Sequence, residues 1–238
     1  MTEQHQSPGI VRWAGYLAIT FLLVLPLAVL TVRSGAWQQG LMMYALACLG
    51  SVLILILSGV LLLLPKFAPH RAGLGLRALI ALPGALLLLS LLGGRDYPPI
   101  HDISTNTDDP PLFITAENVR GEGANPLDIK PDFITQQLEA YPDLQTLQST
   151  LTIDKAYDQA LATVNTMGWE VYHEDKNAGF IEAVATTGIM AFKDDIVIRV
   201  RSNAAGALID VRSVSRVGVG DIGANALRIR AFAEAFAN

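Results

Sequence analysis

Long apolar runs fill the first part of the chain, whereas apolar and polar positions alternate over short distances in the rest. The apolar runs extend from Trp13 to Val32, from Leu41 to Leu64 and from about Leu74 to Leu92. Each is long enough for a helix that crosses the hydrocarbon core of a bilayer, which takes about 20 residues. The third run carries Arg77 about one turn from its start, where the side chain can reach the headgroups. The pattern predicts a membrane domain of three transmembrane helices within residues 1–95.

Basic residues in the short loops predict the orientation of these helices. Lys66, Arg71 and Arg77 cluster between the second and third runs, whereas Arg33 stands alone between the first two. Because cytoplasmic loops carry the excess of Lys and Arg, the N-terminus and the second loop are expected in the cytoplasm. Three spans then deliver everything after Arg95 to the other side, which in a Gram-negative bacterium is the periplasm. The first run is too long for a signal peptide and is expected to remain as an anchor in the inner membrane.

The residues that follow the apolar runs are typical of an extended segment. Residues 96–146 are rich in Pro, Asp and small polar residues, which sustain neither a long helix nor a central strand. We expect this segment to wrap the domain that follows it. One short helix is predicted within it, from Pro131 to Ala140.

Residues 147–238 are expected to form an α+β domain. Alternation from Leu147 predicts a strand, and a helix should follow from Asp154, its N-cap, to about Met167. Two hairpins should turn at 176–179 and 204–206. A last helix from about Ile222 has one apolar stripe, made of Ile222, Ala226, Ile229, Ala233 and Phe236. The order β-α-β-β-β-β-α predicts an antiparallel sheet with both helices on one face, as in helix-grip folds.

Composition separates the two parts of the chain further. The 238 residues are 51% hydrophobic and 16% charged, and the formal net charge of -5 belongs mostly to the part after Asp96. An acidic domain lacks the basic face that binds phosphates, so we expect no nucleic-acid partner. The single cysteine, Cys48, lies in an apolar run and cannot form an intrachain disulfide.

Gly218, Gly220 and Gly223 have the spacing of a dinucleotide-binding loop. Such a loop needs a parallel strand–helix–strand unit and an acid about 20 residues further on, which holds a ribose. Here the preceding strand belongs to an antiparallel hairpin, only about fifteen residues follow Gly223, and Asp221 would occupy the helix N-cap where a phosphate should lie. We therefore expect these glycines to form a tight turn, with no nucleotide and no cofactor bound.

A second group of residues resembles a metal site only superficially. His101, Asp102, Asp108 and Asp109 all carry groups that ligate metals, but their spacing matches no metal-binding signature. Aspartate before proline is also common in turns. No metal site is expected.

Alternation along the second hairpin places its charged residues on one face of the sheet. Arg199, Arg201, Arg212 and Arg216 share this face with Asp210, opposite the face that packs under the helices. Four guanidinium groups on an open face suit a carboxylate or phosphate ligand, or an acidic partner. The alternative, which we favour, is a solvated ladder of ion pairs, in which Asp210 and the neighbouring hairpin neutralise the arginines through Glu170, Glu174 and Glu182.

The C-terminal motif resembles that of a known family. The stretches "YPPIHDISTNTDDPP", "DDIVIRVR" and "IDVRSVSRVGVGDIGANALRIRAF" are similar to the domain-of-unknown-function 1499 family over about Tyr97 to Phe236. Members similar to this chain often place membrane spans ahead of the domain, and the family implies no reaction. The motif positions that the resemblance carries over are Arg212, Ser213, Ser215, Arg216, Gly218, Asp221, Gly223, Asn225, Arg228 and Arg230. Of these, Asp221, Asn225 and Arg228 look like a cap and a turn clamp rather than a catalytic set.

These observations lead to one preferred function and two alternatives. We expect a non-catalytic binding or scaffold module of the cell envelope, held in the membrane lipid by its spans. It would bind a protein partner or an anionic ligand through the arginine face. The first alternative is an envelope enzyme that acts on a lipid or wall precursor, with acids from residues 101–109 near the arginines. The second is an accessory subunit whose spans pack into a larger membrane complex.

Overall fold

The computed structural model describes residues 8–92 and 97–237, in two compact units, Met1–Arg95 and Asp96–Asn238. The predicted junction at residues 93–95 lies outside the described residues. Each unit packs around its own core, the first as a membrane domain and the second as a domain in water.

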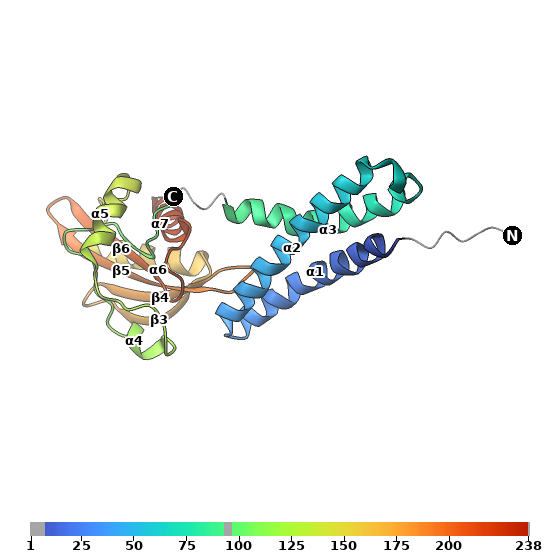
Figure 1. The fold of residues 1–238 in the computed structure, drawn as a ribbon. Coiled ribbons are helices and arrows are strands. Elements are labelled where there is room, and N and C mark those ends of the chain that lie inside the picture. The colour runs from blue at the N-terminus through green and yellow to red at the C-terminus, as the bar shows by residue number, and fades with distance from the viewer. Residues whose placement is uncertain (1–7, 93–96, 238) are drawn as a thin grey trace. The chain divides into compact units, whose positions relative to one another are not determined.

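The first unit consists of three long helices that pack side by side (Figure 1). They are α1 (Gly9–Arg33), α2 (Trp37–Leu63) and α3 (Arg71–Leu92), with the short 3-10 helix η1 (Pro65–His70) between the last two. All three are long and apolar enough to cross a membrane, as the sequence predicts. Small residues allow close approach: Gly50 faces the ring of Phe21, and Gly84 faces Ser51. The chain is a membrane protein.

Arg77 links two of these helices rather than standing free. Its Nε donates to the carbonyl oxygen of Val11 on α1 at 2.6 Å, and its Nη1 donates to that of Gly73 on α3 at 2.5 Å. A Cβ at Gly15 would lie 3.0 Å from Nε, so the absence of a side chain there makes room for the guanidinium. Backbone carbonyls thus satisfy a charged group that lies near the start of an otherwise apolar helix.

The second unit is built on an antiparallel sheet of six strands in the order β1-β6-β5-β4-β3, with β2 also paired to β6. The strands are β1 (Asp102–Ser104), β2 (Leu147–Ser149), β3 (Glu170–Asp175), β4 (Phe180–Thr186), β5 (Lys193–Asn203) and β6 (Gly206–Ser215). The hairpins turn where the alternation predicts. The sheet also holds a strand that the sequence did not predict, because β1 lies within the Pro-rich segment.

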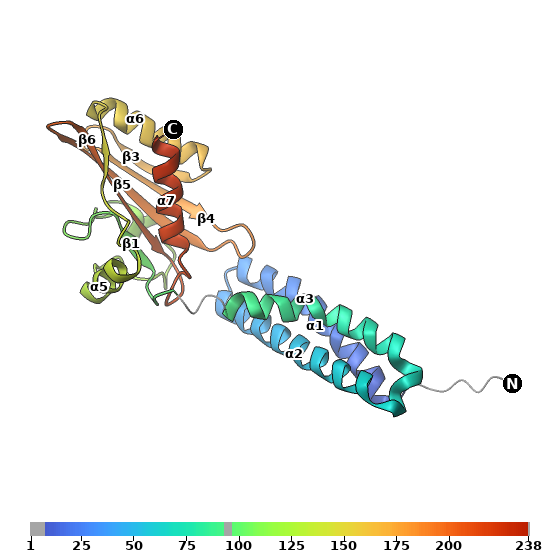
Figure 2. The same cartoon turned by 90° about the horizontal axis from the view of Figure 1, so that it is seen from above.

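Helices α6 (Ile153–Thr166) and α7 (Ala224–Ala237) cover one face of this sheet (Figure 2). Their apolar sides meet the inward residues of β5 and β6, including Ile196, Ile198 and Val211, all fully buried. This confirms the predicted α+β arrangement with the helices on one face. Figure 1 labels two shorter helices that precede β2, α4 (Ala116–Val119) and the predicted α5 (Pro131–Ala140).

The free edge of β1 is covered by a side chain of α5. The amide of Gln137 accepts from Ser104 N at 2.9 Å and donates to Ser104 O at 2.6 Å. An unpaired strand edge invites pairing with other chains, and here a buried glutamine takes the place of another strand.

Two predicted helix starts are wrong by a few residues. α6 begins at Ile153 with Thr152 as its N-cap residue, so Asp154 lies inside the first turn. α7 begins at Ala224, because Gly223 has a φ of +77° and cannot belong to a right-handed helix. Ile222 consequently lies outside the predicted buried stripe, and Phe232 packs in the core instead.

Candidate functional site

The outer face of the sheet, which points away from α6 and α7, carries most of the buried charge of the domain. The register of β5 and β6 pairs Asp195 with Val214, Val197 with Arg212 and Arg199 with Asp210 on this face. Residues that pair directly across strands share a face. The alternation predicted from the sequence is therefore confirmed for this hairpin.

This outer face is not open to water, contrary to the sequence-based expectation. Residues 105–130, which we call the strap, run across it and contact each of its charged clusters. Arg212 is 1% exposed, while the carboxylates of Asp195 and Asp210 are fully buried. Alternation tells which side of a strand a residue takes, but it does not tell what covers that side.

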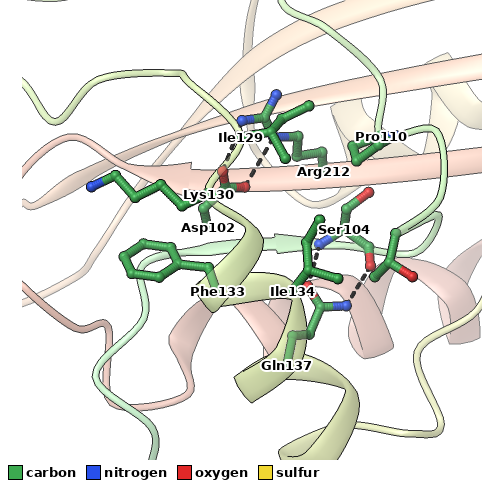
Figure 3. A pocket seen from close by; sticks show the side chains of 10 residues that line it. Asp102, Ser104, Pro110, Ile129, Lys130, Phe133, Ile134, Gln137 and Arg212 are labelled. Carbon is green, nitrogen blue, oxygen red and sulfur yellow. Dashed lines mark hydrogen bonds and ion pairs between the residues drawn. The ribbon is translucent and has the colours of Figure 1, made fainter.

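Arg212 joins the strap to the centre of the sheet (Figure 3). Its Nε and Nη2 donate to Oδ1 and Oδ2 of Asp102 at 2.9 and 2.7 Å, a two-pronged ion pair between β6 and β1. The same guanidinium donates to the carbonyl oxygens of Leu127 at 2.7 Å and Pro111 at 3.3 Å, and it lies over the ring of Phe113. The guanidinium group is planar and has several donors in fixed directions, so it can bind one carboxylate and two carbonyl oxygens at once. Two points of the strap, Pro111 and Leu127, are thereby fixed to one residue.

Asp195 forms a second cluster under the strap with two arginines. Arg216 donates to both of its oxygens at 2.7 and 2.9 Å, and these bonds outweigh burial and raise the pKa of Arg216. Arg120, from the strap, places Nε 3.2 Å from Asp195 Oδ2, yet none of its three guanidinium nitrogens has a hydrogen bond of good geometry. Burial lowers the pKa of Arg120. The hydroxyl of Tyr172 lies 3.4 Å from Oδ1 of Asp195. Burial raises the pKa of Tyr172, and the neighbouring carboxylate of Asp195 raises it further.

Asp210 gathers the third cluster. One of its oxygens accepts from Arg199 and Arg201 at 2.8 to 3.0 Å, and the other accepts from the hydroxyl of Thr146 at 2.6 Å. Burial alone would raise the pKa of this carboxyl, but the hydrogen bonds outweigh burial and hold it below its ordinary value. Arg199 also reaches Asp109 on the strap at 3.0 Å. Asp210 thus pairs with the arginines as the ladder interpretation expects.

Glu182 serves the strap rather than the arginines. Its carboxylate is fully buried and accepts from the backbone N–H of Ile114, and from the N–H and hydroxyl of Thr115 at 3.0 and 2.6 Å. Glu170 and Glu174 are exposed on β3, which is separated from β5 by β4. The predicted cross-strand neutralisation by these three glutamates is therefore wrong, because groups of the strap occupy the carboxylate of Glu182, and because β3, which carries Glu170 and Glu174, is not paired with β5 or β6.

The polar residues of the motif on the helix side form one connected network. Asn225 is fully buried; its Nδ2 donates to His101 O and Ser215 Oγ at 3.1 and 2.9 Å, and its Oδ1 accepts from Ser213 Oγ at 2.7 Å. Arg228 donates to Ser213 Oγ and to Asn225 Oδ1, and it also pairs with Asp194. The network joins α7 to β1, β5 and β6, in line with a clamp.

The glycine motif forms a tight turn between β6 and α7. Gly218 and Gly223 have φ values of +96° and +77°, which glycine adopts without strain. A Cβ at Gly220 would lie 3.1 Å from Pro99, and a Cβ at Gly223 would meet the ring of Tyr97 at 2.5 Å. The turn therefore lies directly against residues 97–100, which supports the structural interpretation of these glycines.

Asp221 holds the start of α7. Its carboxylate accepts from the N–H groups of Gly223 at 2.9 Å and Asn225 at 2.8 Å, as an N-cap aspartate does. Burial raises the pKa of Asp221, and these two backbone hydrogen bonds offset only part of that effect. The position where a nucleotide loop would hold a phosphate is thus taken by a carboxylate of the chain itself.

The remaining residues singled out from the sequence have separate partners. His101 Nδ1 lies 3.0 Å from Val219 O, Asp102 and Asp109 pair with different arginines, and Asp108 is exposed. Arg230 forms an exposed ion pair with Asp143. Within residues 8–92 and 97–237, no group of three or more His, Cys, Asp or Glu side chains is arranged to hold a metal ion.

Sequence reasoning missed Asp195 and Arg120 on the outer face, and it did not identify Asp102 as the partner of Arg212. Asp195 could have been found, because it alternates in phase with Arg199 along β5. The role of Asp102 as the partner of Arg212 and the presence of Arg120 under the strap depend on how the strap folds back. Neither has a signal in local spacing.

The charged clusters leave little space for a ligand. The cavity beside Arg212 and Asp102, lined also by Phe133 and Gln137, measures about 10 Å³, enough for one water molecule (Figure 3). A more open hollow of about 280 Å³ lies outside, along strap residues 117 and 120–127. The guanidinium and carboxylate groups neutralise one another in pairs, which suits fixing a loop better than transferring protons.

Comparison with known proteins identifies the family of the second unit. The model of a family described as "Protein of unknown function (DUF1499)" matches residues 102–236, from the start of β1 to the penultimate residue of α7. No curated protein matches the chain. The matched range includes the strap and all of the clusters described above.

Proposed function

The chain belongs to the DUF1499 family, for which no activity is known, and on this premise we propose that its C-terminal domain is a non-catalytic binding module that presents the strap to a protein partner. The spans hold this module in the bacterial inner membrane. The excess of basic residues around η1, compared with the single Arg33 between α1 and α2, supports a cytoplasmic N-terminus and a periplasmic domain in the cell envelope.

One observation carries the proposal: buried charged groups hold a long irregular segment in a fixed conformation. Loops longer than about 12–15 residues with little secondary structure are uncommon unless they function. The strap spans residues 105–130 and contains only the four-residue helix α4. Arg212, Glu182 and Asp195 contribute their charges to holding it, although burying charge is costly. A rigid scaffold that fixes one loop is typical of binding proteins.

The outer surface of the strap has the composition of a recognition surface. Leu112 is 62% exposed, and Ile114 and Val119 are exposed as well. The strap also carries exposed carboxylates, from Asp108, Asp109, Glu117, Glu122 and Asp128. A segment with exposed apolar side chains and carboxylates fits a protein partner with apolar and basic side chains.

The other functions have less support. An enzyme that acts on a lipid or wall precursor needs a pocket for its substrate, but the cavity where the acids of residues 101–109 meet Arg212 holds about one water molecule. An anionic ligand at Arg199 or Arg201 would have to compete with Asp210, which already takes both guanidinium groups. An accessory role of the spans in a larger complex is compatible with the proposal and is separated from it by the same experiment.

Site-specific photocrosslinking tests the proposal. Benzoylphenylalanine replaces Leu112 on the strap or, as the matched control, Asn165 on α6, which is exposed on the opposite face of the domain. The full chain is irradiated in its native membranes. We expect a discrete crosslinked species from position 112 that weakens as salt screens the carboxylates of the strap, and none from position 165. Crosslinks of equal yield at both positions, or crosslinks from probes in α1–α3 with none from position 112, contradict the proposal.

A further inference from the structure

One end of the sheet is formed by three segments that lie against one another, and we call it the tip. It consists of residues 97–100, the β4–β5 loop at residues 187–192, and the turn at residues 217–223. Asp221 N donates to Ile100 O at 3.1 Å, and Gly223 faces the ring of Tyr97. Arg216 N, which precedes the turn, donates to Lys193 O at the end of the β4–β5 loop at 3.0 Å.

The tip presents apolar side chains to its surroundings. Val219 is 78% exposed, Ile189 73% and Ile222 53%, and Tyr97 is exposed beside them. The β4–β5 loop reads Thr-Gly-Ile-Met-Ala-Phe, with no charge. The hairpin turns at the other end of the sheet read Lys-Asn-Ala-Gly and Asn-Ala-Ala-Gly, which suit water. A group of exposed apolar side chains at one end of a sheet marks an interaction surface.

Ile222 is held in a conformation that isoleucine disfavours. Its φ is +53°, in the left-handed region, where a β-branched side chain is strained and asparagine or glycine is tolerated. Neither the strained backbone of Ile222 nor its apolar side chain in water stabilises the folded domain. The side chain of Ile222 is therefore explained by what it contacts outside the domain.

The occupant of this surface follows from the covalent chain. α3, the last membrane span, ends at Leu92, and the tip begins at Tyr97. Five residue steps reach at most about 18 Å, so the tip is tethered next to the bilayer surface whatever path residues 93–96 take. We propose that the tip inserts Val219, Ile222 and Ile189 into the lipid–water interface, with Tyr97 at the headgroup level, where tyrosine is enriched. This contact holds for either orientation of the chain and does not depend on the partner of the strap.

Lipid-quenching fluorescence on the full chain tests this contact. Cys48, the single cysteine, is replaced by alanine, and a new cysteine carries an environment-sensitive dye either at Val219 or at Ala204, in the β5–β6 turn at the other end of the sheet. The protein is reconstituted in vesicles of phosphatidylethanolamine and phosphatidylglycerol that contain nitroxide-labelled lipid. We expect the nitroxide to remove most of the emission at position 219 and little at position 204, with iodide in the water phase showing the reverse.

Each other outcome overturns the inference. If iodide quenches the dye equally at both positions, the tip is in water. If the dye at position 219 is shielded from iodide but not quenched by the nitroxide lipid, a protein surface covers the tip instead.

A variant separates lipid contact from folding. Ile222→Asn relieves the backbone strain, so the melting temperature should stay or rise, while nitroxide quenching at position 219 should fall. Ile153→Gln is the control and should leave the quenching unchanged. It replaces an exposed isoleucine at the start of α6, close to Thr150, which lies against Gly206 at the other end of the sheet. Unchanged quenching in Ile222→Asn would show that Ile222 does not take part in the contact with lipid.

Discussion

Arg212 on β6 and Asp102 on β1 form a two-pronged ion pair, and the same guanidinium donates to Leu127 O of the strap. One buried cation therefore binds two segments that lie 110 and 85 residues away from it in the sequence. The arginine-rich motif acts first as the fastening of the strap, and whatever binds the strap depends on this fastening.

Loss of this cation should destabilise the domain strongly. Arg212→Gln leaves Asp102 and two strap carbonyls without their donor in a largely buried site, and breaking a buried pair in this way costs about 3–5 kcal/mol. Arg230→Gln breaks the exposed pair with Asp143, which is worth about 0–1 kcal/mol, and serves as the control. Thermal melting of the full chain in detergent measures both. Equal shifts for the two variants would contradict the role assigned to Arg212.

Acid should weaken the fold through Asp210. Its pKa in the folded protein is depressed, so in the unfolded chain the carboxyl binds a proton at a higher pH than in the native state. The stabilisation is present above the unfolded pKa of about 3.9 and is lost as the pH falls through the lower folded pKa. Urea unfolding at a series of acidic pH values should show this loss. Asp210→Asn should be less stable at neutral pH and should flatten this part of the profile; a profile as steep as that of the parent chain would count against it.

Asp221 should show the opposite sign. Burial raises its folded pKa, so its protonation contributes stability that is full below the unfolded pKa and is lost as the pH rises through the folded value. Asp221→Asn keeps a capping side chain without this titration, and its stability relative to the parent should increase with pH across that window. Asp221→Ala removes the cap and should cost about 1 kcal/mol. Chemical unfolding of the parent protein and the two variants at matched pH values measures these differences. Parallel pH profiles for the parent and Asp221→Asn would refute the raised pKa of Asp221.

The glycine turn should prove structural and bind no nucleotide. Gly223→Ala forces a Cβ into the left-handed region, at a cost of about 1–2 kcal/mol, and pushes it against Tyr97. Gly121→Ala, in open space and with an ordinary φ, is the control and should melt close to the parent protein. Calorimetry with NAD and ATP should give no heat of binding. Saturable micromolar binding that disappears in Gly220→Val would show instead that the loop is a nucleotide site.

The topology should place the C-terminus outside the cytoplasm. Alkaline phosphatase fused after Asn238 is expected to be active, since Lys66, Arg71 and Arg77 retain the loop between α2 and α3 in the cytoplasm. A fluorescent protein that folds only in the cytoplasm should be dark at the same position. The reverse pair of signals would invert the orientation and move the proposed module into the cytoplasm.

Local sequence patterns were sufficient to predict the elements whose side chains face a single environment, either lipid or the protein core. Apolar length alone identified the three spans, because a helix in lipid must expose apolar side chains over its full length. Period-two alternation and glycine at the turns identified the hairpins β3–β4 and β5–β6, because one face of each strand packs under helices. The same alternation correctly put Arg199 and Arg212 opposite Ile198 and Val211.

Backbone conformation at single residues decided the helix starts, which spacing did not reveal. Ile222 continues the apolar stripe of α7 in the sequence, but the positive φ of Gly223 separates it from the helix. The stripe begins one turn later and gains Phe232 instead. Because Ile222 and Gly223 both have positive φ, the side chain of Ile222, which was predicted to lie in the core, is exposed at the tip.

The sequence by itself determined which residues share the charged face, while only the tertiary structure decided that this face is closed. The composition of residues 96–146 predicts a segment that wraps the domain, but the spacing of residues 105–130 does not show that they cover β5 and β6. The strap lacks a repeating pattern, and its backbone pairs with side chains such as Arg212 and Glu182. Burial then turns an apparent anion-binding surface into a set of matched ion pairs. A charged group in water is free to bind a ligand, whereas the same group in a dry interior must already have its partner.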